Sequence, residues 1–323
     1  MRAVDSTPGC HANRRARSRS ASHWGWTPGT QPKAGIPART RVDCRSPSRP
    51  YGANTSVTIK LEKPLQKGLS WMLAYNFGRT KDYSSSSTIA FSSFTSTRTV
   101  NGNNLPGYSF SDNDITHRII GNITYRKEIA KLAAIQISLF GQSQNLGRFS
   151  YGYSNDFNGD GISGNDLLYI PRDQTEMNFD AITGSAPFTV QQQKDAFESY
   201  IQNNAYLKSH RGEVAQRNGV LQPMLTRFDL SVMVELFRNI LKQRHTIQFR
   251  GDIFNIGNMI NNKWGVVHVT NTTSPLAWSR TDANGLPFFK MNTVNNSLNY
   301  ETYRKGTAVA DVWQVQLGVR YIF

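Results

Sequence analysis

Apolar and polar residues alternate strictly along seven segments of the chain. In the last of them, "VWQVQLGVRYIF", the apolar side chains occupy every second position from Trp313 to Phe323. A β-strand sends successive side chains to opposite faces, so each segment predicts a strand with one apolar and one polar face. The predicted strands are 56–62, 70–78, 118–126, 135–142, 227–236, 246–253 and 312–323.

The links between these segments alternate between short and long. The short ones are "KPLQKG", a few residues around 128–131, and "RNILKQR", and the long ones are about 81–113, 150–224 and 259–306. A compact soluble domain rarely contains three links of that length. Short turns at one rim and long loops at the other are typical of an up-and-down outer-membrane barrel. We therefore expect an all-β fold, part of an antiparallel transmembrane β-barrel with about seven strands and long extracellular loops.

The residues on the two faces support this interpretation. The polar positions include many charges, which a dry core would not tolerate but a wet lumen would: Arg118, Arg126, Asp229, Glu235, Arg250, Asp252 and Arg320. The apolar positions carry aromatic residues near strand ends, as in an aromatic girdle: Trp71, Tyr75, Tyr125, Trp313, Tyr321 and Phe323. A soluble antiparallel sheet with one solvated face is the alternative.

Composition changes this picture only at the N-terminus. Mean hydropathy is −0.49, and no run of about 18 apolar residues predicts a transmembrane helix. The net charge of +15 is uneven, because residues 1–50 alone hold ten Lys or Arg against two acidic residues. Both cysteines, Cys10 and Cys44, lie there too, so the rest of the chain has no disulfide framework.

Residues 1–50 are rich in Arg, Ser and Pro and lack apolar periodicity. Such a segment cannot bury enough surface to offset its conformational entropy, so we expect disorder. It has no apolar stretch of the kind that marks a secretory signal. It is either a native tail or the product of a misplaced start codon, and a basic arm for nucleic acid is a further alternative.

Counting strands back from the C-terminus gives an odd number. Single-chain bacterial barrels have even strand numbers, so we expect residues 51–323 to be the C-terminal part of a larger barrel.

The segment "DFNGDGISGND" contains a candidate metal loop. Asp156, Asn158 and Asp160 match the first, third and fifth ligand positions of a calcium loop, and Gly161 matches its turn position. The glutamate expected at position twelve is replaced by Leu167. A cluster of turn-forming residues at a loop tip is the alternative interpretation.

Other motifs point away from catalysis. The six histidines show no metal-ligand spacing, and the sequence contains no nucleophile elbow, P-loop or dinucleotide fingerprint. We therefore expect no enzyme activity. Residues 190–207 predict an amphipathic helix that packs against its own loop. Loop aromatics either contact a ligand or pack within the loops: Tyr83, Phe91, Phe94, Tyr151, Tyr153, Trp264, Trp278, Phe288 and Phe289.

From about residue 54 onward, the chain resembles the C-terminal part of a TonB-dependent outer-membrane receptor, most closely the large receptors of Bacteroidetes-type bacteria. The resemblance lies in "DFNGDGISGNDLLYIPRD", "FESYIQNNAYLKSHRGEVAQRN", "RFDLSVMVELF", "HTIQFRGDIFNIGNMINNKWGV" and the terminal strand. It implies a 22-stranded barrel filled by a plug domain, and uptake of a nutrient ligand driven through the TonB complex.

In that family the plug and the segment that contacts TonB lie upstream of the matching region. We therefore expect a fragment that lacks the plug and reaches TonB only through that missing part. Its expected surroundings are outer-membrane lipid in the Gram-negative cell outer membrane, with an unknown nutrient ligand and no nucleic acid.

The resemblance also implies that the barrel-assembly machinery reads the terminal strand, so its apolar face is an expected assembly signal: Trp313, Val315, Leu317, Val319, Tyr321 and Phe323. Two other classes stay open: a soluble β-rich adhesin or binding module, and a basic nucleic-acid-binding protein that acts through residues 1–50.

Overall fold

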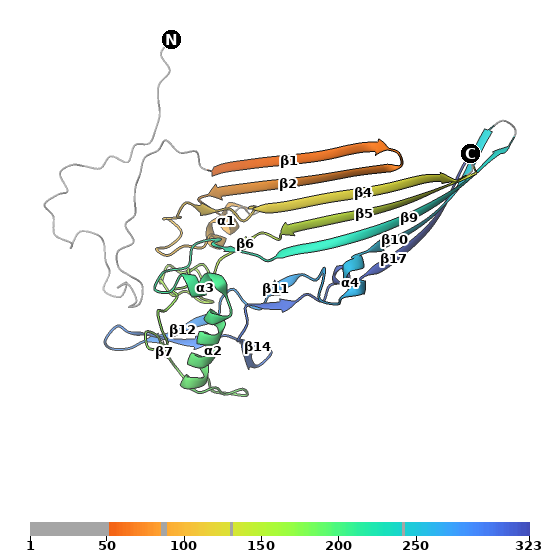
Figure 1. Ribbon diagram of the computed structural model, residues 1–323. Helices are drawn as coiled ribbons and strands as arrows, with labels where there is room; N and C mark the ends of the chain where they lie inside the picture. The colour runs from red at the N-terminus through yellow and green to blue at the C-terminus, as the bar shows by residue number, and fades with distance from the viewer. Residues whose placement is uncertain (1–51, 85–88, 130–131, 241–242) are drawn as a thin grey trace, which may run out of the picture.

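Seven long strands form one antiparallel up-and-down sheet (Figure 1). The computed structural model describes residues 52–84, 89–129, 132–240 and 243–323. The strands are β1 (Gly52–Gln66), β2 (Leu69–Asp82), β4 (His117–Ile129), β5 (Ala133–Asn145), β9 (Met224–Ile240), β10 (Gln243–Phe254) and β17 (Gln314–Ile322). Each one contains or overlaps a predicted segment, so the seven predicted strands are confirmed. The basic segment 1–50 lies outside the described residues.

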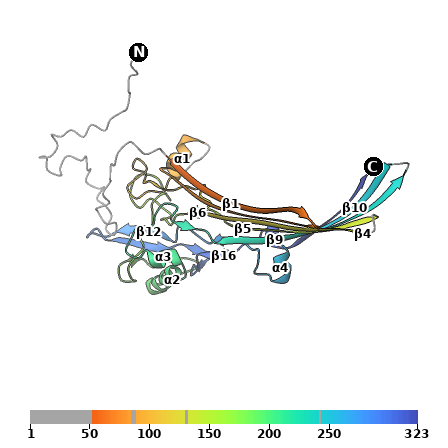
Figure 2. The same cartoon turned by 45° about the horizontal axis from the view of Figure 1, so that its top comes forward.

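The sheet is curved and stays open among these residues, with β1 at one edge and β17 at the other (Figures 1 and 2). No helix in the described part of the chain is long and apolar enough to cross a membrane.

The strand register keeps the two faces of the sheet separate. One row of directly paired residues crosses six strands on the apolar face: Trp71, Ile123, Leu139, Leu230, Ile253 and Val315. The adjacent row on the other face is polar throughout: Ser70, Thr124, Ser138, Ser231, Asp252 and Gln316. Because the side-chain period is two, this agreement fixes the register of these six strands.

The charges on the polar face contact one another. Arg126 and Glu235, on strands β4 and β9, form an ion pair with 2.6 Å between Nη2 and Oε2. Gln248 on β10 donates to the other carboxylate oxygen of Glu235, also at 2.6 Å. A polar network therefore spans the strands where the alternation predicts a wet surface.

The link between β1 and β2 is shorter than the sequence indicated. In place of the predicted six-residue link "KPLQKG", the structure has a two-residue turn, because β1 extends to Gln66 and β2 begins at Leu69. Lys67 and Gly68 have φ values of 51° and 84°, as a tight hairpin turn requires. A Cβ on Gly68 would lie 2.5 Å from the carbonyl oxygen of Arg126 on the neighbouring strand β4, so only glycine fits at this position.

All three long links leave from the same end of the sheet, which we call the loop end, and the short turns and the C-terminus lie at the opposite turn end (Figure 1). The links contain short elements of their own, which the alternation did not predict. These are α1 (Ala90–Ser96), β3 (Ser109–Phe110), β6 (Arg148–Phe149), β7 (Asn178–Phe179), α2 (Val190–Gln202), α3 (Ala205–Ser209), β8 (Val220–Leu221), α4 (Ile256–Ile260), β11 (His268–Thr270), β12 (Leu276–Thr281), β13 (Pro287–Met291), β14 (Thr293–Val294), β15 (Ser297–Leu298), β16 (Tyr303–Lys305) and the 3-10 helix η3 (Val309–Asp311).

The second and third links fold together into one unit, the loop body, residues 148–223 and 261–306. Strands β7 and β13, from different links, pair in parallel. Among the described residues, every buried apolar side chain except Ala134 belongs to this unit. The packed core of the chain therefore lies in its loops, while the long strands expose both faces.

The predicted amphipathic helix over residues 190–207 is divided between α2 and α3, because Asn204 caps a second helix that begins at Ala205. Helix α2 packs into the loop body, as predicted. Thr189 and Gln192 form a capping box at its first turn. Phe197, Tyr200 and Ile201 on its inner face are buried in the common core. Packing within the loop, rather than ligand contact, is therefore the role of this face.

Candidate functional site

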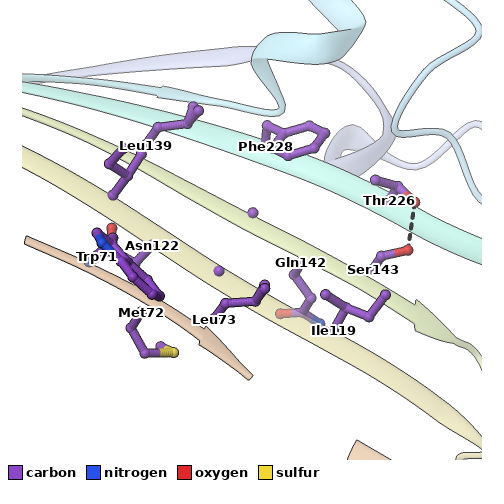
Figure 3. Close-up of a pocket in the computed structure, with 13 residues that line it drawn as sticks. Trp71, Met72, Leu73, Ile119, Asn122, Leu139, Gln142, Ser143, Thr226 and Phe228 are labelled. Carbon is purple, nitrogen blue, oxygen red and sulfur yellow. Dashed lines mark hydrogen bonds between the residues drawn. The ribbon is translucent and has the colours of Figure 1, made fainter. Parts of the chain in front are cut away.

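An apolar hollow lies on the apolar face of the sheet (Figure 3). It has a volume of about 320 Å³ and is lined by Trp71, Leu73, Ile119, Leu139 and Phe228, among others. Gly121 and Gly141 pair directly across β4 and β5, and the ring of Phe228 lies over Gly141, where a Cβ would come within 2.8 Å of it. The hollow is a depression in a broad exposed apolar surface, and it offers hardly any polar group to orient a solute.

The loop aromatics divide into buried and exposed sets. Tyr151, Tyr153 and Phe289 are buried in the core of the loop body. Tyr153 stacks on Phe289 with 5.4 Å between the ring centroids. Burial raises the pKa of Tyr153 and Tyr151 above the ordinary tyrosine value, so both rings carry neutral hydroxyls.

The exposed set includes Phe91 and Trp264, whose side chains are 72% and 55% exposed. Phe94 is exposed as well, whereas Trp278 packs against the edge of the core. The exposed rings of Phe91, Phe94 and Trp264 are therefore accessible to a ligand from outside the loop body.

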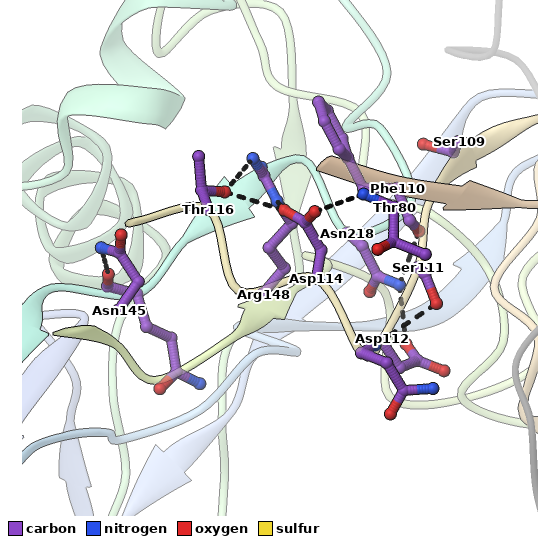
Figure 4. Close-up of polar contacts among 12 residues, drawn as sticks. Thr80, Ser109, Phe110, Ser111, Asp112, Asp114, Thr116, Asn145, Arg148 and Asn218 are labelled. Carbon is purple, nitrogen blue, oxygen red and sulfur yellow. Dashed lines mark hydrogen bonds and ion pairs between the residues drawn. The ribbon is translucent and has the colours of Figure 1, made fainter. Parts of the chain in front are cut away.

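A buried ion pair joins the first long link to the loop end (Figure 4). The fully buried carboxylate of Asp114 accepts hydrogen bonds from the backbone N–H of Thr80 at 2.6 Å, from the hydroxyl of Thr116 at 2.8 Å, and from Arg148 Nε. Arg148 also lies over the ring of Phe110, with 3.7 Å from Cζ to the centroid.

Burial alone would raise the pKa of the Asp114 carboxyl, but the hydrogen bonds from Arg148, Thr80 and Thr116 outweigh it and hold the pKa below its ordinary value. Asp114 is therefore ionised, and it joins β2 and β6 to Thr116, the residue that precedes β4.

The candidate calcium loop adopts the turn that its sequence predicts. The backbone N–H groups of Gly159 and Gly161 donate to Asp156, at 2.7 and 3.0 Å. Gly161 has a φ of +87°, which its glycine permits. Asn158 and Asp160 cap the next backbone N–H groups in the same way. The three predicted residues therefore surround one turn, at the surface of the loop body.

Asp166 is a neighbour of this turn that sequence spacing did not assign. Its Oδ2 accepts from the N–H groups of Phe157 and Asn158, whereas its buried Oδ1 has no hydrogen-bond partner. Burial, with a contribution from Asp160 and Asp156, raises the pKa of Asp166 to about 6. Across the described residues, no group of three or more His, Cys, Asp and Glu side chains has the arrangement of a metal centre.

The predicted assembly signal extends along the whole edge strand β17, and its last residues lie at the turn end of the sheet. Val315, Leu317, Val319 and Tyr321 share the apolar face of β17, while Trp313 and Phe323 flank the strand. Phe323 is 85% exposed and stacks on Tyr321, with 5.6 Å between the centroids. This row is accessible from the edge of the sheet.

The comparison with known families agrees with this geometry. The sequence model of the outer membrane beta barrel domain matches residues 49–275, which is more than half of the chain. The chain belongs to the outer membrane beta barrel family. No curated protein and no solved structure shows a significant match. Family membership places this barrel chain in the outer membrane.

Several polar residues of the barrel's loop end were not predicted from the sequence. Asp114, Arg148 and Arg217 are buried and paired, yet no periodic pattern or motif marks them. Their partners lie far along the chain; Arg217, for example, pairs with Asp82 at 2.8 Å. Only the folded links bring such residues together.

We expect Asp114→Asn to destabilise the loop end of the barrel strongly. The change leaves the buried Arg148 without its counter-charge, which costs roughly 3–5 kcal/mol. Asp180→Asn is the matched control, because its partner Arg280 has a half-exposed side chain, and such pairs contribute about 1 kcal/mol or less. The free energy of unfolding in urea is measured for both variants, folded in detergent, together with the rate of proteolysis within residues 111–116.

The pH dependence of Asp114 has a definite sign. Because its folded pKa is lowered, its stabilising contribution is complete above the unfolded value of about 3.9 and falls only as the pH drops further. Equal losses of unfolding free energy in Asp114→Asn and Asp180→Asn at pH 7 would contradict the role assigned to the pair of Asp114 and Arg148.

Proposed function

We propose that this chain forms the C-terminal strands and extracellular loops of a TonB-dependent outer-membrane receptor for a nutrient ligand. The observation that supports it most is that all three long links leave one end of the sheet and two of them fold into a body with its own buried core. A simple pore needs no such body, whereas a receptor needs a rigid surface that holds its ligand.

The faces of the sheet suit this role. The apolar face, with the hollow of Figure 3, would contact outer-membrane lipid, while the face that carries Arg126, Glu235 and Gln248 would line an aqueous lumen. In this proposal Phe91 and Trp264 are ligand contacts on the outer surface. The activity is binding and uptake rather than catalysis, and nucleic acid has no part in it.

Deletion of the gene in its native bacterium should abolish accumulation of one ligand from a panel of labelled siderophores, oligosaccharides, peptides and vitamin B12. Deletion of tonB should abolish accumulation of the same ligand, because uptake of this kind draws on the inner-membrane proton gradient. Complementation with the full-length gene carrying Phe91→Ala and Trp264→Ala should lower uptake, while Val190→Ala, which changes another exposed apolar loop residue, should not. Uptake that persists without tonB would identify a passive channel instead.

We further propose that Ca²⁺ orders the Asp156 turn of the loop body. Carboxylate and amide oxygens of Asp156, Asn158 and Asp160 are hard ligands of the kind that Ca²⁺ prefers. The buried Oδ1 of Asp166, which lacks a partner, supports a cation nearby, since buried carboxylate oxygens rarely stay unpaired. Ca²⁺ would supply the missing positive charge.

Ca²⁺ should slow proteolysis at Asn155 relative to chelator in the wild-type protein. Asp156→Asn should remove this protection, because it removes a charged ligand from the turn. Asp173→Asn is the control: this carboxylate is exposed and caps Thr175 in another turn of the loop body. Equal cleavage of the wild type with Ca²⁺ and with chelator would refute the calcium site.

We also propose that the barrel-assembly machinery binds the apolar row of β17. The exposure of Phe323 and its neighbours at the edge of the sheet supports this, because an edge strand offers unpaired backbone groups to a partner.

Deletion of Phe323 from the full-length protein should therefore reduce the yield of heat-modifiable barrel on a semi-native gel. Burying one Phe contributes only about 1.5–3 kcal/mol, so the expected defect is in assembly rather than in final stability. Val319→Ala, on the same face but inside the strand, should reduce the yield much less. Equal reductions would make Phe323 an ordinary packing residue.

A further inference from the structure

A polar pocket of about 200 Å³ lies where the first long link meets the loop body. Its walls come from separate parts of the chain: the segment after α1, the segment after β3, strand β6, the turn at residues 217–218, and Thr273. Three of its lining residues are arginines, Arg98, Arg148 and Arg217, against one carboxylate, Asp112. The wall therefore carries an excess of positive charge.

Two of these arginines hold buried donors that nothing satisfies. Arg217, with a side chain only 3% exposed, donates Nη2 to Asp82 at 2.8 Å, while its Nε and Nη1 have no hydrogen-bond partner. Arg98 donates Nη2 to the hydroxyl of Thr273 at 3.4 Å, and its Nη1 has no partner. Buried polar groups are hydrogen-bonded in the great majority of native structures, so three orphaned guanidinium donors indicate a missing acceptor.

The charges of these arginines are balanced unequally. Arg148 and Arg217 are neutralised by Asp114 and Asp82, but none of the ion pairs in the described part of the chain includes Arg98. Desolvation lowers the pKa of the Arg98 guanidinium from its ordinary value, because this cation is partly buried and has no carboxylate partner. Arginine stays protonated in proteins, so this cost is removed only by an anion.

The polar residues of the pocket are held in place without that anion. Asn218 accepts from the hydroxyl of Ser150 at 3.1 Å and donates to Asp112 at 2.6 Å. Its φ of 52° lies in the left-handed region and makes the sharp turn that follows Arg217. The arginine donors therefore belong to a framework that is fixed on several sides.

We propose that this pocket binds a small oxyanion, such as phosphate, sulfate or a carboxylate group, through Arg98 and Arg217. Planar guanidinium groups match the oxygen geometry of these anions. The volume is below the roughly 300–1,000 Å³ of sites that enclose a whole drug-sized ligand. The occupant is thus one anion, or one anionic group of a larger molecule. The site does not depend on TonB-driven uptake.

The test uses the full chain folded in neutral detergent micelles, titrated calorimetrically with inorganic phosphate, sulfate and acetate at constant ionic strength. We expect saturable binding of at least one of them. R98Q and R217Q should each weaken it by about tenfold, the usual scale for losing a charged hydrogen bond. R304Q, which removes the same charge from exposed strand β16 outside the pocket, should leave the affinity unchanged.

Arg217 also holds Asp82, so R217Q alone could act by loosening the fold. R98Q avoids this problem because Arg98 has no carboxylate partner. In a buffer without phosphate, sulfate or acetate, R98Q should melt at or above the wild-type temperature, since it removes an unpaired, partly buried charge. A purely structural arginine would instead lower the melting temperature.

Dissolved anions and lipid headgroups share this chemistry, and a second arm separates them. A phosphate-bearing lipid is added to the micelles, and its competition with dissolved phosphate is measured in the wild type and in R98Q. If the lipid displaces dissolved phosphate from the wild type but not from R98Q, the occupant is a lipid headgroup. If phosphate binds and the lipid does not displace it, the occupant is a dissolved anion. No saturable binding of any anion, or equal weakening in R98Q and R304Q, would overturn the site.

Discussion

The hydrogen-bonded register of the seven long strands is the constraint on which the other features depend. Across the middle of the sheet, the six strands from β2 to β17 are paired so that a row of apolar residues on one face lies beside a row of polar residues on the other. A shift of one residue in a single strand would carry that strand's charges to the apolar face. Glu235, which holds Arg126 and Gln248 on the polar face, would then lie against the membrane without partners. The alternation therefore specifies both the fold and its surroundings.

The same register determines where the links begin. Because the strands run up and down and their short links lie at one end, the long links gather at the other end. At that end, links of this length would leave many backbone N–H and C=O groups without hydrogen-bond partners if they stayed irregular. The loop body instead folds around a buried aromatic core, and short strand pairs such as β7 with β13 supply hydrogen bonds to its backbone. Backbone pairing holds the sheet, whereas apolar burial holds the loops.

This division explains which features the sequence predicted. Period-two alternation is local, so it identified all seven long strands and the polarity of their faces. The two-residue strands β3, β6, β7 and β8 exist only because a partner lies beside them, and no local pattern marks them. Among the loop aromatics, sequence could not separate the buried Tyr151 from the exposed Trp264, because burial there depends on contacts between distant links. The calcium turn was visible because its residues are adjacent, whereas Asp166 was not assigned.

The buried charges at the loop end show what non-local folding adds. Arg217 pairs with Asp82 at the end of β2, and Arg148 pairs with Asp114 in the first long link, so these ion pairs join the loops to the sheet. Arg98 lies among them without such a partner. A chain that only needed to fold would gain stability from a neutral residue at this position, because an unpaired buried charge is costly. The arginine is therefore better explained by what it binds than by what it supports, and the polar pocket between the first long link and the loop body is where recognition of an anion is to be expected.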